Sequence, residues 1–271
     1  MKIKALNRFR QKLAKDELLV GMFVTLESPC IVEMAVSLNF DWIVIDAEHG
    51  HLGWKEIAEL NRATVRSETV ALVRIAERNT ALIKRVLDIG VDGILVPNVE
   101  SVAEVEAAVA DCRYPPEGRR GIGGERATVW GQCFAEHAAE ANDHVLVVPM
   151  IESPVGAQNA SAYCKVDGVD AIYFGPADFS ANAGYRGQWE GPDVAEQILA
   201  AKDAIRAAGK QCGLIATSPE NLVERQEQGF RMLGIGSDAK LLLQSIHEAL
   251  AVVGRDRKPA TSLDPQDSQP I

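Results

Sequence analysis

The sequence predicts an α/β fold, a (β/α)8 TIM barrel formed by a single domain. Three observations support this prediction: short apolar segments recur along the chain, helix signals lie between them, and 271 residues accommodate eight β–α units. The apolar segments are rich in Val, Ile and Leu and lack polar alternation, which is typical of strands covered on both faces. In chain order they cover residues 20–26, 41–48, 69–75, 93–99, 145–152, 171–178, 210–216 and 232–238.

Helix start and stop signals separate these predicted strands. Ser101 and Glu104 form a capping box, and Gly90 and Gly229 stand where a helix would end. Ser-Pro pairs open three further segments, at residues 28–29, 153–154 and 218–219. Alternation of strands and helices implies parallel pairing, and eight such units within about 250 residues favour a closed barrel. A doubly wound open sheet is the alternative.

Two regions interrupt the β–α rhythm. Residues 113–144 insert about thirty residues between the fourth and fifth predicted strands, and insertions of this length usually form a lid, a binding loop or an interface. Residues 254–271 are polar, contain prolines and show no apolar period, so we expect them to be disordered or to lie on a neighbour. The barrel domain is therefore expected to span residues 1–253, including an N-terminal helix and the insertion.

Composition and charge exclude several classes of protein. The formal net charge of −10 disfavours nucleic acid and anionic membranes as partners and favours small-molecule chemistry. The N-terminus places apolar residues at helical spacing among Lys and Arg, unlike a signal peptide, and no segment reaches the roughly 18 apolar residues of a membrane span. The five cysteines form no CxxC pair, so neither a disulfide framework nor a thiolate zinc site is indicated, and we expect a cytoplasmic protein.

Two carboxylates are the first candidates for chemistry, because functional groups of such barrels gather where the strands end. Glu152 and Asp178 end the fifth and sixth predicted strands and should share one rim. Two oxygen ligands without a His or Cys cluster suit Mg²⁺ or Mn²⁺. The alternatives are solvated loop carboxylates, or a glycosidase-type acid and base pair that needs no metal.

A guanidinium and an imidazole complete the predicted rim. Arg74 ends an otherwise apolar strand and could stabilise an enolate or bind a carboxylate, although a structural salt bridge with Asp46 or Glu48 is an equal alternative. His49 could serve as a general base, while a hydrogen-bonded structural role is the alternative. His51 competes for the same role.

The turn from Gly175 to Asp178 would present backbone N–H groups at the rim and could bind a substrate carboxylate. The glycine pair Gly234 and Gly236 could cradle a phosphate, but tight packing is the favoured interpretation. No lysine is placed for Schiff-base chemistry inside the barrel, so metal chemistry is the simpler hypothesis.

Five longer motifs closely resemble the HpcH/HpaI aldolase family over about residues 8 to 250. They are FDWIVIDAEHG, LVRIAERNTALIKRVLDIGVDGILVPNVES, RYPPEGRRGIGG, MIESPVGAQN and VDGVDAIYFGPADFSANAGY. The resemblance implies a (β/α)8 barrel, usually a hexamer, that cleaves a 4-hydroxy-2-oxo acid reversibly into pyruvate and an aldehyde. It also implies a divalent metal ion, Mg²⁺, Mn²⁺ or Co²⁺, as cofactor.

The resemblance also implies roles for single residues. Glu152 and Asp178 would hold the metal, and the amides of Ala177 and Asp178 would meet the pyruvate carboxylate. Arg74 would stabilise the enolate. His49 would be the base.

Two further positions are implied by the same resemblance. Asp88 of the LDIG motif would raise the basicity of the base, either within the chain or across a subunit boundary. Met150 stands where the family commonly has a Gln that contacts the oxo acid, and its thioether is at most a weak acceptor, so substrate affinity could differ.

Three questions stay open at the level of sequence. The residues do not name the aldehyde. A CoA-thioester lyase of the citramalyl or malyl-CoA type and a non-catalytic 2-oxo acid binder are alternative functions. A homo-oligomer, hexamer or trimer, is expected, with the N-terminal helix, the insertion and residues 241–253 as contact surfaces.

Overall fold

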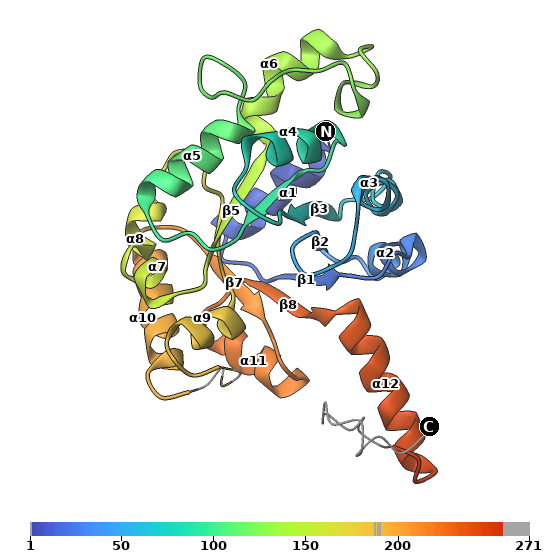
Figure 1. Cartoon of the computed structure of the whole chain (residues 1–271), viewed down its shortest axis with the longest axis vertical. Helices are drawn as coiled ribbons and strands as arrows, with labels where there is room; N and C mark the ends of the chain where they lie inside the picture. Colours follow the sequence, from blue (N-terminus) through green and yellow to red (C-terminus); the bar gives the residue numbers. More distant parts are fainter. Residues whose placement is uncertain (1, 187, 189–190, 257–271) are drawn as a thin grey trace, which may run out of the picture. The chain divides into compact units, whose positions relative to one another are not determined.

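The computed structural model describes residues 2–186, 188 and 191–256, and its eight strands close into a parallel barrel in chain order (Figure 1). This confirms the predicted fold and all eight predicted strands. Seven of the strands lie within their predicted segments, and the first begins one residue before its segment. The strands are β1 Leu19–Val24, β2 Trp42–Asp46, β3 Val70–Arg74, β4 Gly93–Val96, β5 Leu146–Ile151, β6 Ile172–Phe174, β7 Cys212–Ile215 and β8 Met232–Ser237.

The helices between the first and the last strand connect the strands and lie around the barrel (Figure 1). They are α1 Ile3–Ala14, α2 Pro29–Ser37, α3 Trp54–Ala63, α4 Thr80–Asp88, α5 Val102–Cys112, the 3-10 turn η1 Arg126–Thr128, α6 Phe134–His144, α7 Pro154–Gln158, α8 Ala160–Tyr163, α9 Pro176–Asn182, α10 Val194–Ala207, α11 Pro219–Glu227 and α12 Asp238–Val252. None in the described part of the chain is both long and apolar enough to cross a membrane.

The predicted helix signals are confirmed. The Ser101 hydroxyl accepts from the Glu104 amide while the Glu104 carboxylate accepts from the Ser101 amide, which satisfies two N–H groups at the start of α5. Gly90 and Gly229 follow α4 and α11 with φ of +85° and +97°, a region that glycine enters without steric cost. Ser28 precedes α2 but makes no side-chain cap bond.

The interior of the barrel is filled by every second residue of the strands, because side chains of a strand alternate between its faces. One apolar cluster takes Trp42 and Val44 from β2, and Val148 and Met150 from β5. The same alternation places the next residues of these rows at the carboxyl end of the barrel. The inner face therefore changes from apolar to charged at that rim.

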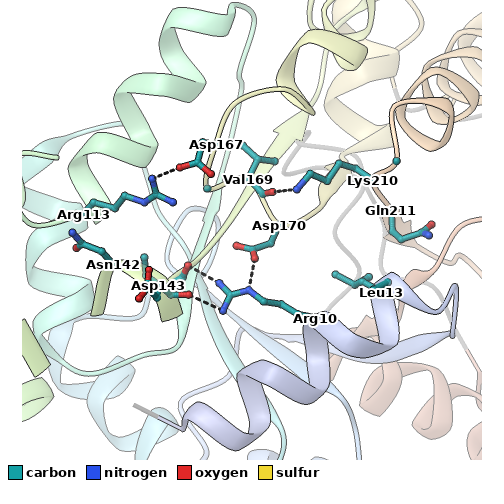
Figure 2. A pocket seen from close by; sticks show the side chains of 14 residues that line it. Arg10, Leu13, Arg113, Asn142, Asp143, Asp167, Val169, Asp170, Lys210 and Gln211 are labelled. Carbon is teal, nitrogen blue, oxygen red and sulfur yellow. Dashed lines mark hydrogen bonds and ion pairs between the residues drawn. The ribbon is translucent and has the colours of Figure 1, made fainter. Parts of the chain in front are cut away.

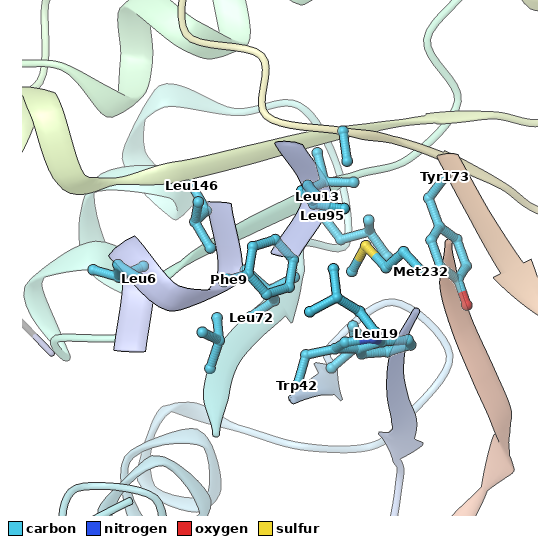
Figure 3. Packing of buried hydrophobic residues seen from close by; sticks show 14 of the residues in the cluster. Leu6, Phe9, Leu13, Leu19, Trp42, Leu72, Leu95, Leu146, Tyr173 and Met232 are labelled. Carbon is cyan, nitrogen blue, oxygen red and sulfur yellow. The ribbon is translucent and has the colours of Figure 1, made fainter. Parts of the chain in front are cut away.

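Helix α1 packs against the opposite end of the barrel. Its Leu6, Phe9 and Leu13 belong to the same buried cluster as Leu19 and Leu146, which begin β1 and β5 (Figure 3). The helix is amphipathic as predicted. Its apolar face is occupied by the barrel of its own chain, and contact of this helix with a partner stays a prediction.

The insertion of residues 113–144 contains η1 and the predicted Ala-rich helix, α6. Tyr114 is joined to α6 by a pair of hydrogen bonds, since its N–H donates to the Asn142 side chain, which in turn donates to the Tyr114 carbonyl. Val129 and Trp130 are exposed apolar residues of this insertion. They remain available as contact surface.

The chain divides into two compact units, one from Met1 to Asp238 and one from Ala239 onward. The first unit holds the barrel and the second holds most of α12, whereas the expected domain limit at residue 253 stays a prediction. Helix α12 leaves several apolar side chains exposed: Leu242, Leu243, Ile246 and Val252. Of the predicted disordered tail, residues 257–271 lie outside the described residues.

Substitution of Gly213 by Ala is expected to destabilise the barrel. A β-carbon at Gly213 in β7 would lie 1.8 Å from the carbonyl oxygen of Met232 in β8, and a backbone oxygen of the barrel cannot move aside cheaply. Overpacking of this kind costs about 1–3 kcal/mol or more, so thermal unfolding should begin several degrees earlier. Gly124→Ala is the matched control, because nothing lies within 4 Å of its β-carbon. Equal melting temperatures for the two variants would contradict this packing.

His137 of α6 is expected to make stability fall in mild acid. Burial lowers the pKa of His137 from 6.5 to about 4, and the Arg120 charge acts in the same direction, so the folded protein favours the neutral ring. The stability that the neutral His137 ring contributes is fully present above pH 6.5, where this ring is neutral in the unfolded chain too. That stability is lost as the pH falls from 6.5 toward 4. The free energy of unfolding of the His137→Gln variant, measured with urea, should therefore fall less over that pH interval than that of the wild type. Exposed His51→Gln is the control; a parallel decline in all three proteins would exclude this role.

Candidate active site

An ion-pair cluster on β2 and β3 forms the first part of the charged rim. Asp46 and Arg74 are register partners on these strands, and both are buried. The Arg74 guanidinium donates to both oxygens of Asp46, with Nε to Oδ1 at 2.9 Å. Its Nη1 lies 3.1 Å from Glu48 Oε2, and its Cζ lies 5.2 Å from the centre of the Phe23 ring. The guanidinium is thus fixed in one orientation, and the predicted salt-bridge alternative is present.

Glu152 is the second part of the rim. It follows β5 in the inward-facing row above Met150, and it is buried. The Asn98 amide donates to Oε2 at 2.7 Å, whereas Oε1 is buried without a hydrogen-bond partner. Burial raises the pKa of Glu152 to about 7, and the charges of Glu48 and Asp178 act in the same direction. The site therefore holds a carboxylate whose charge lacks compensation.

Asp178 reaches the same rim from the first turn of α9. Strands β5 and β6 are neighbours as predicted, and their register brings Gly175 opposite Glu152. The Asn182 side chain of α9 donates to the Glu152 carbonyl at 2.8 Å and so joins this helix to the end of β5. The amides of Ala177 and Asp178 fall in the first helical turn, where N–H groups have no acceptor within the helix. Ala177 is exposed.

These residues fit a divalent cation. Burial raises the pKa of both Glu48 and Glu152, and the Asp178 charge acts in the same direction on each, while Arg74 already pairs with Asp46. A cation would compensate this excess negative charge and would give Glu152 Oε1 a partner. Within the described ranges, three or more His, Cys, Asp or Glu side chains do not converge as a metal-binding group. Two carboxylate ligands would leave the other positions to water and substrate, as Mg²⁺ sites usually do.

Substitution of Gly175 by Ala is expected to disturb this carboxylate rather than the fold. A β-carbon there would lie 2.3 Å from Glu152 Oε1 and 3.0 Å from its Cδ, so the carboxylate must rotate away. Displacing a ligand in this manner should weaken Mn²⁺ binding by about 10–100-fold. Calorimetric titration with Mn²⁺ measures this, with Gly124→Ala as control. An unchanged affinity would mean that Glu152 Oε1 is not used.

His49 stands at the edge of the rim. Its side chain is 60% exposed, and its Nε2 lies 3.7 Å from Glu48 Oε2. The Asp46 carboxylate accepts from the amides of Glu48 and His49, which fixes the backbone at this point. His49 is therefore open to solvent at the rim, and its role as a base stays a prediction. His51 is more exposed and lies beside Glu27.

Asp88 pairs with Arg120 within the chain. It ends α4, and its Oδ1 accepts from Arg120 Nη2 at 2.9 Å, an ion pair with the insertion. The buried Arg120 guanidinium also lies 4.6 Å from the centre of the Tyr114 ring. Contact between Asp88 and a histidine of another subunit stays a prediction.

Met150 lies one inward step below Glu152, among the buried residues of the barrel core. Its register partner on β6 is Tyr173. The position is under the rim as expected, while contact with substrate stays a prediction. Gly234 is closely surrounded by side chains. A β-carbon there would lie 3.0 Å from both Ile215 and the Tyr173 hydroxyl, which agrees with the interpretation that this glycine serves tight packing.

Several contributors were not assigned roles from the sequence. Glu48 appeared there only as a possible salt-bridge partner, yet it adds a third carboxylate beside Glu152 and Asp178. The Asn98 amide, which donates to Glu152, is a backbone group, so patterns of side chains in the sequence do not predict it. Asn98 has a left-handed backbone conformation, with φ of +53°. Asp238 has a structural role, because it accepts from the amides of Thr25 and Leu26.

Known proteins are similar to this chain over most of its length. The model of the HpcH/HpaI aldolase/citrate lyase family matches residues 19–245. A hydroxypyruvate/pyruvate aldolase of Pseudomonas aeruginosa is 36% identical over 89% of this chain and 91% of its own length. A 4-hydroxy-2-oxovalerate aldolase of Rhodococcus jostii is 35% identical over 88% of this chain and 92% of its own. A crystal structure of an HpcH/HpaI aldolase/citrate lyase family protein from Burkholderia cenocepacia superposes with a TM-score of 0.87, at 30% identity, covering 91% of this chain and 99% of that one.

Proposed function

The chain belongs to the HpcH/HpaI aldolase/citrate lyase family, and from this we propose that it is a class II aldolase. It cleaves a 4-hydroxy-2-oxo acid reversibly into pyruvate, or a close 2-oxo acid, and an aldehyde. The relatives named as aldolases extend over most of the chain, which supports a carbon–carbon lyase. The observation that supports the proposal most strongly is the charged rim at the carboxyl end of the barrel. Asp46 fixes the Arg74 guanidinium there, and the buried Glu152 carboxylate has an oxygen without a hydrogen-bond partner.

A divalent ion, Mg²⁺, Mn²⁺ or Co²⁺, would be held by Glu152 and Asp178. When bound, it would supply a Lewis acid for the 2-oxo group of the substrate. The amides of Ala177 and Asp178 would hold the substrate carboxylate. Met150 would form the floor beneath the oxo acid.

Arg74 would stabilise the negative charge that develops on the substrate. In the cleavage direction the bond between C3 and C4 breaks, and its electron pair forms the enolate of pyruvate. Asp46 holds the Arg74 guanidinium in place before the reaction begins, so no reorganisation is needed when that charge appears. Arg74 keeps its proton at all relevant pH values and therefore acts as a fixed charge.

His49 would take the proton of the 4-hydroxyl group, directly or through a water, as the aldehyde carbonyl forms. A proton delivered to C3 of the enolate then completes pyruvate. The Glu48 carboxylate, 3.7 Å from the His49 Nε2, would face the ring between these steps. Asp88 of another subunit could act on the same ring if the assembly brings it there.

A cleavage assay tests the proposal. The purified protein is incubated with racemic 4-hydroxy-2-oxopentanoate and Mg²⁺, Mn²⁺ or Co²⁺, and pyruvate is measured with lactate dehydrogenase. We expect pyruvate to form with at least one metal and to cease with EDTA. Cleavage of a malyl-CoA thioester alone would favour the CoA-lyase alternative. Oxalate binding without turnover of any 4-hydroxy-2-oxo acid would favour a non-catalytic binder.

We further propose that the chain forms a homo-oligomer, a trimer or a hexamer, in the cytoplasm. Exposed apolar side chains on α12 and in the insertion support an assembly. All five cysteines are free, which supports a reducing compartment. The partners are then small molecules, a 2-oxo acid and an aldehyde, rather than nucleic acid or membrane.

A further inference from the structure

Arginine side chains form ion pairs at both ends of the barrel, and the two groups contact different structures. At the amino ends of β5, β6 and β7, ion pairs line a cavity of about 400 Å³ (Figure 2). Each cation that lines it among the described residues already has a partner: Arg10 with Asp170, Arg113 with Asp167, and Lys210 with the Val169 carbonyl. This cavity therefore needs no ligand to balance its charge.

At the carboxyl end of the barrel, Arg78 contacts the loop between β4 and α5. Arg78 itself lies between β3 and α4. Its Nη1 donates to the carbonyl oxygen of Pro97 at 3.1 Å and to that of Asn98. Its Nη2 donates to Glu104 Oε1 at 2.6 Å, in the first turn of α5. One guanidinium thus joins the loop after β3 to the loop after β4 and to the helix that follows.

The carboxylate partner of Arg78 is itself held in place. The second oxygen of Glu104 accepts from the amide of Glu100 at 2.8 Å and from that of Ser101 at 3.1 Å. Both oxygens of Glu104 are therefore used, one at the start of α5 and one on Arg78. Because a guanidinium presents its donors in one rigid plane, these contacts define the orientation of Arg78 although its side chain is 32% exposed.

The peptide group between Pro97 and Asn98 connects Arg78 with Glu152. This peptide is trans and planar, so its carbonyl and its N–H point in opposite directions. Arg78 donates to the carbonyl, whereas the N–H donates to Glu152 Oε2 at 2.7 Å. A rotation of this peptide plane would break both hydrogen bonds together. The hydrogen bond to the carbonyl also polarises the peptide group, which strengthens its N–H as a donor.

The Glu152 carboxylate depends on this one peptide group. Within the described part of the chain, Asn98 is its hydrogen-bond donor, and Oε1 has no partner. Asn98 adopts a left-handed backbone conformation, with φ of +53°, which is uncommon for a residue with a side chain and persists where surrounding contacts impose it. The contacts of Arg78 with both carbonyls of this turn supply such a constraint.

We propose that Arg78 is a positioning residue for the metal site: it orients the peptide group between Pro97 and Asn98, whose N–H fixes the Glu152 carboxylate for the cation. The inference rests on the proposed function, since that function makes Glu152 a metal ligand. Arg78 acts through the peptide group and is not a catalytic residue. Groups that orient a metal ligand in this way typically change metal affinity by 10–100-fold when they are removed.

Calorimetric titration of the full-length protein with Mn²⁺ is the first measurement. Arg78→Met keeps an aliphatic side chain but removes every donor, and we expect it to weaken Mn²⁺ binding by about tenfold or more. Arg78→Lys keeps a charged donor that cannot reproduce the planar fork, so it should recover part of this loss. Arg66→Met is the matched control, because Arg66 is exposed and lies between α3 and β3.

Hydrogen exchange in EDTA tests the contact without metal or turnover. Mass spectrometry of a peptide that contains residues 97–101 should show faster exchange in Arg78→Met than in the wild type and in Arg66→Met. Glu104→Gln guards against loss of the fold, because its amide oxygen can still accept at the start of α5 while Arg78 loses its carboxylate partner. This variant should also exchange faster, with a smaller loss of Mn²⁺ affinity. Melting temperatures in EDTA show which variants are folded.

Two results would overturn the role of Arg78. One is equal Mn²⁺ affinity in folded Arg78→Met and wild type, and the other is unchanged exchange of residues 97–101 in both Arg78→Met and Glu104→Gln. Failure of the proposed function is distinguishable from these. A wild-type protein that bound none of Mn²⁺, Mg²⁺ and Co²⁺ would refute the metal-dependent function, and the role of Arg78 with it, even if the exchange of residues 97–101 still responded to Arg78→Met.

Discussion

Replacement of Glu152 by Gln is expected to lower the rate of 4-hydroxy-2-oxo acid cleavage by about 10³-fold or more. The amide removes the charge whose burial is otherwise uncompensated, and loss of a metal ligand forfeits several kcal/mol of transition-state stabilisation. The measurement is initial-rate pyruvate production at saturating Mn²⁺. Glu106→Gln is the matched control, because Glu106 is an exposed residue of α5 and undergoes the same chemical change.

The stability of this variant separates a functional role from a structural one. In EDTA the Glu152→Gln protein should melt at the same temperature as the wild type or higher, because a buried charge has been removed and the Asn98 amide can still donate to the side-chain oxygen. Mn²⁺ should raise the melting temperature of the wild type and not that of the variant. A variant that cleaves substrate at the wild-type rate would remove Glu152 from the mechanism.

Arg74→Met is expected to lower the cleavage rate by about 10²–10³-fold, the usual effect of removing one preorganised group at a developing oxyanion. It should also destabilise the fold by about 3–5 kcal/mol, because Asp46 is left buried without its partner. Arg74→Lys keeps the charge but lacks the planar pair of N–H groups that matches the two Asp46 oxygens, so it should recover part of the stability and little of the rate. Urea unfolding and steady-state kinetics measure the two effects.

The double variant Arg74→Met with Asp46→Asn distinguishes these contributions. Removal of both charges should restore most of the lost stability, because Asp46 is no longer a buried carboxylate without its partner. The rate should stay low. A double variant that regains activity together with stability would show that Arg74 acts only as a structural salt bridge, the alternative that the sequence left open.

The barrel could be predicted because its strands and helix signals are local in sequence. Glu152 and Asp178 could be placed together because the carboxyl ends of neighbouring parallel strands meet at one rim. The structure confirms the strand order, and the register of β5 and β6 explains in addition why a glycine stands opposite Glu152. The need for a residue without a β-carbon at this position depends on the distance between the two strands, which the sequence alone does not give.

The remaining features depend on contacts between distant segments. The apolar face of α1 could equally have met a partner or the barrel, and only the packed cluster decides between them. Asp88 was assigned a place beside the base, but within one chain it pairs with Arg120, thirty-two positions later. The Asn98 amide at Glu152 is a backbone group, which side-chain patterns do not report.

Exchange of the pyruvate methyl protons for deuterium tests the central claim most directly, because it requires enolate formation and no knowledge of the aldehyde. Pyruvate is incubated in D₂O with the protein and Mg²⁺, Mn²⁺ or Co²⁺, and the methyl signal is followed by NMR. We expect exchange that depends on the metal, stops with EDTA and is lost in Glu152→Gln and Arg74→Met. Exchange that EDTA does not affect, or no exchange with any of the metals, would contradict a metal-dependent aldolase built on Glu152, Asp178 and Arg74.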